Sequence, residues 1–342
     1  MSEFKVNTIT NRDGSHGPQV CGITTFGSSG MTLPSGPTEF RGGRGRGITG
    51  GGFVSPSSQN VMDFIEIATT GNAQDFGDLT VILRNIATCA SSTRGIFASG
   101  QSPSNNDVIM YTIISSSGGC NDFGNLSSVM TNSNEGCTSD NTRGLIVFGS
   151  NVPDVRQGSI EFVTIPTTGD SNGFGELSVP RRHTASMASP IRGVFASGKN
   201  DYDSVYLKNI DFVIIQTQGT AVAFGEISGN GREQSVGAGN KTRGLMAGGL
   251  ESPTPYQNID FITLATEGNG QDFGDLSANR FGMASMSSST RATFAAGSTP
   301  SNTNAIEFVT IASTGNAANF GDLTVARTVP QGLSDAHGGL AQ

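Results

Sequence analysis

The chain has 342 residues and a formal net charge of −8, which excludes a global positive field of the kind that attracts nucleic acid or anionic lipid. Charged residues make up only 14% and hydrophobic residues 35%, while 48 glycines favour short strands joined by tight turns. No run approaches 18 apolar residues, so we expect no membrane insertion, and the N-terminus MSEFKVNTIT lacks the pattern of a secretory signal.

Residues 1–40 form an N-terminal arm that matches no later part of the chain. Alternating residues predict one strand over residues 4–9 and another over residues 22–26, with a turn at residues 11–14 between them. An isolated hairpin has too little apolar surface to fold alone. We therefore expect this extended β arm to dock on the rest of the chain or to pair with other subunits, and a homo-oligomer is the expected assembly.

The run Arg41-Gly-Gly-Arg44-Gly-Arg46 follows the arm and has the composition of an Arg-Gly box for RNA. It is one short copy in an acidic protein, and its last residue belongs to the first repeat described below. We interpret it as a hinge and expect no nucleic-acid partner.

Residues 41–342 repeat themselves with a period of about 50 residues, which is typical of repeat architectures. Each unit contains a Phe-Gly dipeptide followed by a polar residue, Leu or Ile, and then Ser or Thr. We expect the six phenylalanines to be the main core anchors between blades, because burying one Phe is worth about 1.5–3 kcal/mol. They are Phe76, Phe123, Phe174, Phe224, Phe273 and Phe320.

Four short segments recur in one order within each unit. An Arg-Gly segment such as residues 192–198 is followed by an alternating run such as residues 209–215, and then by the Phe-Gly segment. A segment of small residues, often led by Arg as at residues 181–189, comes last. Four strands in a unit of about 50 residues are typical of a propeller blade, and the six units predict an all-β, six-bladed β-propeller.

The two ends of the repeat region complement each other. The first Arg-Gly segment, which begins at Arg46, has no small-residue strand before it, whereas the last Phe-Gly strand is followed by one at residues 325–334. We therefore predict that the C-terminal strand completes the first blade and closes the ring, which removes open sheet edges. The domains are then the arm, residues 1–40, and the propeller, residues 41–342.

One rim of the predicted ring carries loops that differ in length and composition among the units. Exposed Tyr on variable loops of a rigid scaffold is the composition of a recognition surface, and the alternative interpretation is that these rings lie over the rim as packing. The candidate binding residues on this rim are Tyr202, Tyr206, Tyr256, Lys199, Lys208, Asp154 and Arg156.

The sequence offers little for catalysis, and we expect a protein that is not an enzyme and uses no cofactor or metal. The three histidines, His16, His183 and His337, occupy different positions of the repeat, and we expect His183 to be packed or to cap a turn. Cys89 and Cys137 are interpreted as small buried residues at equivalent positions of neighbouring blades. We expect the repeated arginines of the Arg-Gly segments to support turns through hydrogen bonds.

The order of segments resembles that of kelch repeats: an Arg-led strand of small residues, a strand ending near Gly-Gly, and a short aromatic strand. Phe-Gly stands where kelch repeats usually carry Trp, and this chain has no Trp. The resemblance covers residues 41–342 and implies a kelch-like propeller, with little implication for activity.

A second resemblance spans the arm and the ring. The opening Lys5-Val6-Asn7-Thr8-Ile9-Thr10, the Gly22-Ile23-Thr24-Thr25-Phe26 segment and the Phe-Gly-Asp-Leu repeats are similar to fibre-like virion proteins of tailed phages, notably marine cyanophages. The resemblance implies a virion protein of the tail or fibre, made in the host cytoplasm. Its arm would bind other virion proteins, and its ring would serve host-surface recognition of a glycan or protein, or decoration. The alternatives are a kelch-like carbohydrate-active enzyme or oxidase, and a kelch-type adaptor that binds a peptide.

Overall fold

The structure, a computed structural model, describes residues 24–25, 31–32, 45–101, 103–130, 136–149 and 158–340. The chain divides into two units, Met1–Arg41 and Gly42–Gln342, each of which is described by itself. In the first unit, β1 (Thr24–Thr25) and β2 (Met31–Thr32) pair antiparallel, and β1 lies within the second strand predicted for the arm. The strand predicted over residues 4–9 lies outside the described residues. No helix in the described part of the chain is long and apolar enough to cross a bilayer.

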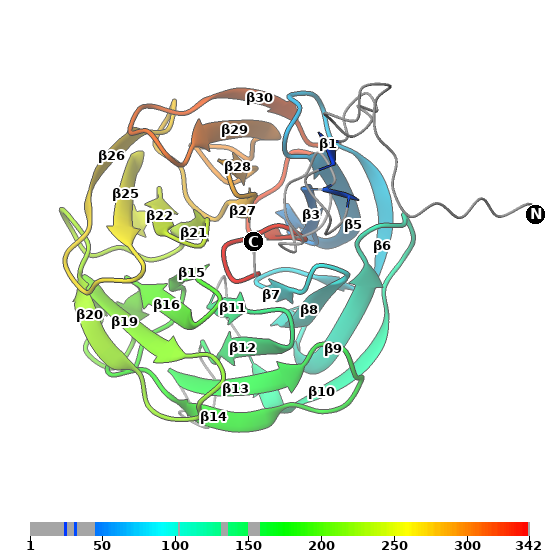
Figure 1. The fold of residues 1–342 in the computed structure, drawn as a ribbon, viewed down its shortest axis with the longest axis horizontal. Helices are drawn as coiled ribbons and strands as arrows, with labels where there is room; N and C mark the ends of the chain where they lie inside the picture. Colours follow the sequence, from blue (N-terminus) through cyan, green and yellow to red (C-terminus); the bar gives the residue numbers. More distant parts are fainter. Residues whose placement is uncertain are drawn as a thin grey trace, which may run out of the picture. The chain divides into compact units, whose positions relative to one another are not determined.

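The second unit is a six-bladed β-propeller, in which antiparallel sheets surround one axis (Figure 1). Each blade runs from an inner strand near the axis to an outer strand at the periphery. The second blade consists of β7 (Ala87–Ala90), β8 (Arg94–Gln101), β9 (Asn105–Ile113) and β10 (Asn121–Met130). The third consists of β11 (Cys137–Ser139), β12 (Arg143–Val147), β13 (Ser159–Thr164) and β14 (Asn172–Glu176).

The remaining blades repeat this order. The fourth consists of β15 (Ala185–Ala188), β16 (Arg192–Ala196), β19 (Asn209–Ile214) and β20 (Val222–Glu226). The fifth consists of β21 (Val236–Gly239), β22 (Arg243–Ala247), β25 (Asn258–Thr263) and β26 (Gln271–Asp275). The sixth consists of β27 (Ala284–Ser287), β28 (Arg291–Ala295), β29 (Ala305–Thr310) and β30 (Ala318–Asp322).

The first blade combines the two ends of the propeller sequence. Its inner strand is β31 (Gln331–Ser334), which pairs antiparallel with β3 (Arg46–Gly50) so that Leu333 faces Ile48. Outward follow β5 (Ser57–Glu66) and β6 (Gln74–Leu83), and the short β4 (Phe53–Val54) also pairs with β5. The predicted closure by the C-terminal strand is confirmed.

The Phe-Gly dipeptides join neighbouring blades. All six phenylalanines are buried, and each meets an aromatic ring of the third strand edge-on, with ring centroids 6.0–6.4 Å apart. The carbonyl of Phe224 accepts a hydrogen bond from the Gly268 amide in the next blade, at 3.0 Å. A Cβ on Gly225 would lie only 2.3 Å from the Gly268 carbonyl oxygen, so glycine is required for this close approach.

The arginine that opens each second strand also links two blades. Its guanidinium lies over the third-strand aromatic ring of its own blade, 4.4–4.7 Å from the ring centroid. Arg192 then donates to the Leu264 carbonyl of the fifth blade at 3.2 Å, and Arg291 donates to the Ile67 carbonyl of the first blade at 3.3 Å. The hydrogen bonds expected of these arginines do form, but they reach the following blade and run around the whole ring.

Among the described residues, a buried ion pair lies inside four of the blades. The arginine just before the inner strand reaches an acidic residue on the third strand of the same blade. Arg181 and Asp211 are both fully buried, with Nη1 and Oδ2 2.9 Å apart, and the Ser178 hydroxyl donates to Asp211 as well. Ser178 is the serine that follows Phe-Gly, so this part of the repeated motif contacts the acid of the next blade. The four pairs are Arg181–Asp211, Arg232–Asp260, Arg280–Glu307 and Arg327–Asp63.

Candidate functional site

The variable rim of the fourth and fifth blades carries two small hairpins in addition to the four strands of each blade. One is formed by β17 (Lys199–Asn200) and β18 (Val205–Tyr206), and the other by β23 (Leu250–Glu251) and β24 (Thr254–Pro255). Both lie between the second and third strands of their blades. This rim therefore contains most of the predicted binding residues.

Tyr202 lies at the tip of the first hairpin and is 56% exposed. The Asn200 side chain holds the turn, because its Oδ1 accepts the Tyr202 amide at 2.9 Å and its Nδ2 donates to Asp203 at 3.3 Å. The loop therefore presents an aromatic ring to solvent on a backbone fixed by hydrogen bonds. Among the predicted tyrosines, this one has the geometry of a contact residue.

Tyr206 and Tyr256 serve the hairpins themselves. The Lys199 ammonium lies 5.3 Å from the centre of the Tyr206 ring, and the Tyr206 hydroxyl accepts the Ser252 amide of the neighbouring hairpin at 3.1 Å. The Tyr256 hydroxyl donates to Glu251 at 2.7 Å, and this bond raises the pKa of Tyr256. These two rings join and stiffen the rim, as in the packing interpretation of the sequence.

The other predicted residues are spread more widely. Lys208 is exposed at the foot of the first hairpin, and its carbonyl accepts the Ile227 amide at 2.9 Å. Asp154 and Arg156 lie outside the described residues. Tyr111, the tyrosine that was not assigned to the rim, packs edge-on against Phe123 in the core of the second blade.

His183 lies directly beneath this rim and is buried, as the sequence predicts. Its Nδ1 is 2.8 Å from Glu233, and Arg182 bridges Glu233 and Asp201 of the hairpin loop at 3.5 and 2.9 Å. Burial lowers the pKa of His183 despite the opposing effect of Glu233. His183 also adopts a left-handed backbone conformation with φ 53°, which Asn85 adopts at the same place in the second blade. Its role is therefore to fix the loop to the ring.

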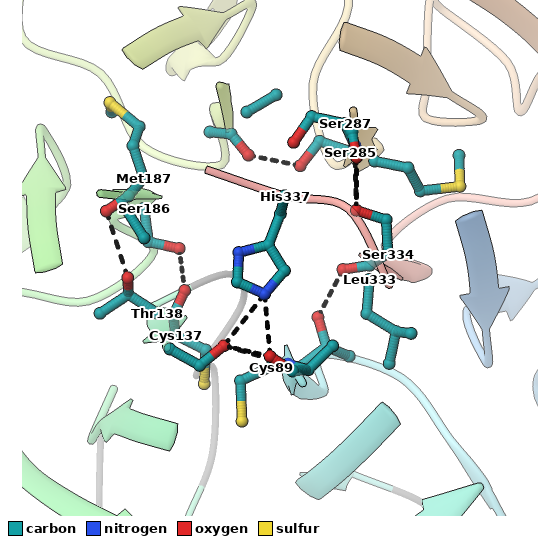
Figure 2. A pocket seen from close by; sticks show the side chains of 18 of the residues that line it. Cys89, Cys137, Thr138, Ser186, Met187, Ser285, Ser287, Leu333, Ser334 and His337 are labelled. Carbon is teal, nitrogen blue, oxygen red and sulfur yellow. Dashed lines mark hydrogen bonds between the residues drawn. The ribbon is translucent and has the colours of Figure 1, made fainter. Parts of the chain in front are cut away.

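The axis of the ring holds a pocket lined by the six inner strands (Figure 2). Inner strands of adjacent blades belong to different sheets, and hydroxyl side chains connect them. Thr88 donates to the Gly332 carbonyl at 2.7 Å, and Ser285 donates to the Gly237 carbonyl at 2.6 Å. The small residues of the inner strands thus save space near the axis and also hydrogen-bond across blade boundaries.

The segment after β31 crosses one end of this pocket, a feature that the sequence analysis missed. Asp335 accepts the amides of Gly45 and Arg46 at the start of β3, at 3.0 and 2.8 Å, and Leu340 is fully buried. His337 lies in the centre, where its Nε2 is 2.8 Å from the Ala90 carbonyl and its Nδ1 accepts the Gly339 amide at 3.1 Å (Figure 2). Both ring nitrogens are thus engaged in holding the segment.

The thiols near the axis are shielded from solvent. Cys89 pairs with Ile96 and Cys137 with Ile146, so their positions differ by one residue in the blade, and the predicted equivalence is wrong. Both are free cysteines, and burial raises the pKa of Cys89 to about 12. In the described residues, no three His, Cys, Asp or Glu side chains gather as metal ligands do. A buried, protonated thiol is a poor nucleophile, so these cysteines act as small packing residues.

Comparison with known proteins adds no further assignment, because no protein-family model and no curated protein matches this chain.

Proposed function

We propose that this protein is a non-enzymatic structural component of a tailed-phage virion, with the arm bound to other virion proteins and the propeller displayed for contact with the host surface. The observation that carries the proposal is the hairpin rim of the fourth and fifth blades. There Tyr202 is 56% exposed on a turn held by Asn200, and the Tyr206–Ser252 bond joins the two hairpins. An exposed aromatic ring on a rigid support loses little conformational entropy when it binds.

The composition of the ring supports a display role. The arginines that open each second strand and the Phe-Gly contacts link each blade to the next, and β31 closes the ring. The rim is therefore carried by a closed, cross-linked scaffold. Buried polar side chains of the kinds that enzymes use each have a structural partner: Arg181 bonds Asp211 in the same blade, His183 lies against Glu233, and His337 against the Ala90 carbonyl. The proposal that the protein belongs to a virion is based on the resemblance of the arm and of the Phe-Gly-Asp-Leu repeats to fibre-like virion proteins.

The first experiment asks whether the protein is part of a particle. Antibodies raised against the propeller should label purified virions of the phage that encodes it, and the chain should appear in their protein composition. A protein that is present in infected cells but missing from purified virions would overturn the proposal.

The second experiment asks whether the rim binds. Purified fluorescent protein should adhere to host cells, and Tyr202→Ser should weaken its affinity about tenfold, the loss expected when a contact worth about 1.4 kcal/mol is removed. Ile113→Thr is a matched control, because Ile113 is a partly exposed residue at the opposite end of the strands. Equal binding by the two variants would show that the rim is not the binding surface. Specific turnover of a host glycan would contradict a non-enzymatic role.

A further inference from the structure

The chain after β31 makes a tight turn over one end of the axial pocket, and His337 is the residue around which the turn folds (Figure 2). The Gly339 amide donates to its Nδ1 at 3.1 Å, and the Leu340 amide donates to its carbonyl oxygen at 3.1 Å. Its Nε2 lies 2.8 Å from the Ala90 carbonyl oxygen of the second blade. The imidazole therefore joins the turn to the ring. We call residues 337–340 the axial strap.

The partners of the imidazole fix its protonation state. A backbone amide only donates and a carbonyl oxygen only accepts, so Nδ1 must be unprotonated and Nε2 must carry the hydrogen. The Ser139 hydroxyl lies 3.3 Å from Nε2, but it already donates to the Ala90 carbonyl at 2.8 Å and accepts the Ala90 amide at 3.1 Å. The closed strap thus requires the neutral Nε2–H form of His337.

Protonation conflicts with this arrangement. The second proton goes to Nδ1, which faces the Gly339 amide, so two donors would oppose each other and the turn would lose a hydrogen bond. The imidazole lines the axial pocket and is partly exposed, so a proton reaches it while the propeller stays folded. In an open strap the conflict disappears, because water accepts from both ring nitrogens.

The strap has little room to adapt to a protonated ring. A Cβ on Gly339 would lie 1.8 Å from the Ser139 carbonyl oxygen, and one on Gly338 would lie 2.3 Å from the Ala188 carbonyl oxygen. Both glycines therefore lie against the inner strands of the third and fourth blades. A shift of the imidazole away from the Gly339 amide has to move these glycines as well.

The titratable side chains on the elements packed against His337 are Asp140, Asp335, Lys241, Cys89 and Cys137. Both carboxylates already accept backbone amides, Asp140 those of residues 142 and 143 and Asp335 those of residues 45 and 46. Lys241 is exposed, and burial raises the pKa of both thiols, which stay uncharged. Burial lowers the pKa of His337, and the Ala90 hydrogen bond and the Asp140 charge oppose this only in part. His337 is therefore neutral near pH 7 and takes up a proton only in acid.

We propose that the axial strap is an acid-released latch, in which protonation of His337 at Nδ1 frees residues 337–340 from the ring and opens this end of the axial pocket to solvent. Asp335 marks the limit of the opening, because it holds the start of β3 through two amides that do not involve His337. The pairing of β31 with β3 is therefore retained, and the propeller stays closed.

Linkage gives the size of the effect. The closed strap excludes the proton and the open strap accepts it with the ordinary histidine pKa of 6.5. The equilibrium constant for opening should therefore rise about tenfold for each pH unit below that value, and it should not change with pH above it.

Hydrogen exchange of the full chain tests the proposal, with rates corrected for the intrinsic effect of pH on exchange. Between pH 6 and pH 5 the protection of the Gly339 and Leu340 amides should fall about tenfold. The Leu333 amide, in the strand that closes the ring, should keep its protection. A strap whose protection does not change over this range would overturn the proposal.

Two variants separate His337 from other groups. His337→Asn keeps an acceptor for the Gly339 amide but does not titrate, so the protection of its strap should be independent of pH. His183→Asn changes the other buried histidine and should leave the acid response of the strap as in the wild type. A strap that still opens in acid in the His337→Asn variant would overturn the proposal.

Nuclear magnetic resonance of the wild-type protein labelled with ¹⁵N-histidine gives a test that needs no folded variant of His337. At pH 8 the signals of His337 should show the Nε2–H form, and their titration should have the same pH dependence as the exchange of the strap. Signals of the Nδ1–H form at pH 8 would contradict the hydrogen-bond assignment and with it the latch.

Discussion

The fourth and second blades fill the same buried space with opposite chemistry. In the fourth blade Arg181 and Asp211 form an ion pair with both side chains fully buried. At the equivalent positions of the second unit, Leu83 at the end of β6 and Met110 on β9 are also fully buried. Even the hydroxyl is retained, since Thr80 approaches the Met110 sulfur at 2.7 Å as Ser178 approaches Asp211.

This difference shows what the repeat needs at these positions. Removing two charges from water costs several kcal/mol per ion, and their attraction offsets this cost only when the pair is complete and hydrogen-bonded. An apolar pair of similar volume avoids the cost altogether. The second blade shows that the ion pair is not required for a blade to form, and in the third blade the buried Glu161 carboxylate is bonded by the Ser127 and Ser171 hydroxyls.

Breaking the charged pair should give the largest effect. Arg181→Leu leaves the Asp211 carboxylate buried beside Ser178 alone, and we expect a loss of about 3–5 kcal/mol in the free energy of unfolding. Denaturant unfolding followed by circular dichroism measures it. A loss below about 1 kcal/mol would mean that water or a rearranged side chain satisfies Asp211.

Removing the hydroxyl should have a smaller effect, and a different one in each blade. Ser178→Ala deletes one donor to a buried carboxylate while the Ser178 amide still donates to it, and we expect a loss of about 1.5–3 kcal/mol, whereas Thr80→Ala removes only a contact to sulfur and should cost less than about 1 kcal/mol. The same unfolding measurement compares the two. Equal losses would show that the hydroxyl acts through packing.

Exchanging the whole pair should nearly restore stability. Arg181→Leu combined with Asp211→Met copies the second blade, and we expect the double variant to unfold within about 1 kcal/mol of the wild type. The coupling energy from the two single variants and the double variant is the measured quantity. A double variant as unstable as Arg181→Leu would refute the equivalence of the two solutions.

The histidine of the fourth blade should affect mainly the pH dependence. Burial lowers the pKa of His183, so below the ordinary value of 6.5 the unfolded chain binds a proton that the folded chain does not. Stability from this group is thus complete above pH 6.5 and is lost as the pH falls. His183→Asn, which copies Asn85, should change the unfolding free energy by less than about 1 kcal/mol at pH 8 and flatten its decline towards pH 5.

His337 provides the control for that measurement, because burial lowers its pKa as well and it lies in a different part of the ring. The variant His183→Asn should retain the share of the pH dependence that His337 contributes. A pH profile identical to that of the wild type would show that His183 does not titrate with folding.

The sequence predicts those features that recur. The spacing of Phe174 and its equivalents predicts the blades, and the missing partner of Arg46 predicts the closing strand. The packing role of His183 also follows from its place in an Arg-led segment. Each of these inferences compares one copy of the repeat with another. The comparison identifies which residues recur at the same structural position, and a single segment does not contain that information.

Features that occur once, and contacts between two different segments of a repeat, were not predicted. Nothing in residues 335–340 resembles a blade, so their path across the axis depends on the pocket that the ring creates. The Arg181–Asp211 pair joins positions 30 residues apart. Its signal is partial covariation: the second unit has Leu83 and Met110 in place of the arginine and the acid, whereas the third unit keeps the acid as Glu161 with no arginine in the segment before its inner strand. On the rim, the roles of Tyr206 and Tyr256 depend on partners in the hairpins, Ser252 and Glu251, which composition alone does not identify.

The pairing of β3 with β31 sets an order of events on the ribosome. Ile48 is synthesised long before Leu333, its partner in the sheet, and at about 5–20 residues per second the wait is roughly a quarter of a minute to a minute. Throughout that interval the nascent first blade lacks its innermost strand. The later blades can pack against one another before β31 pairs with β3 and closes the ring. A chain cut before residue 331 would keep this exposed edge, which chaperones and proteases recognise.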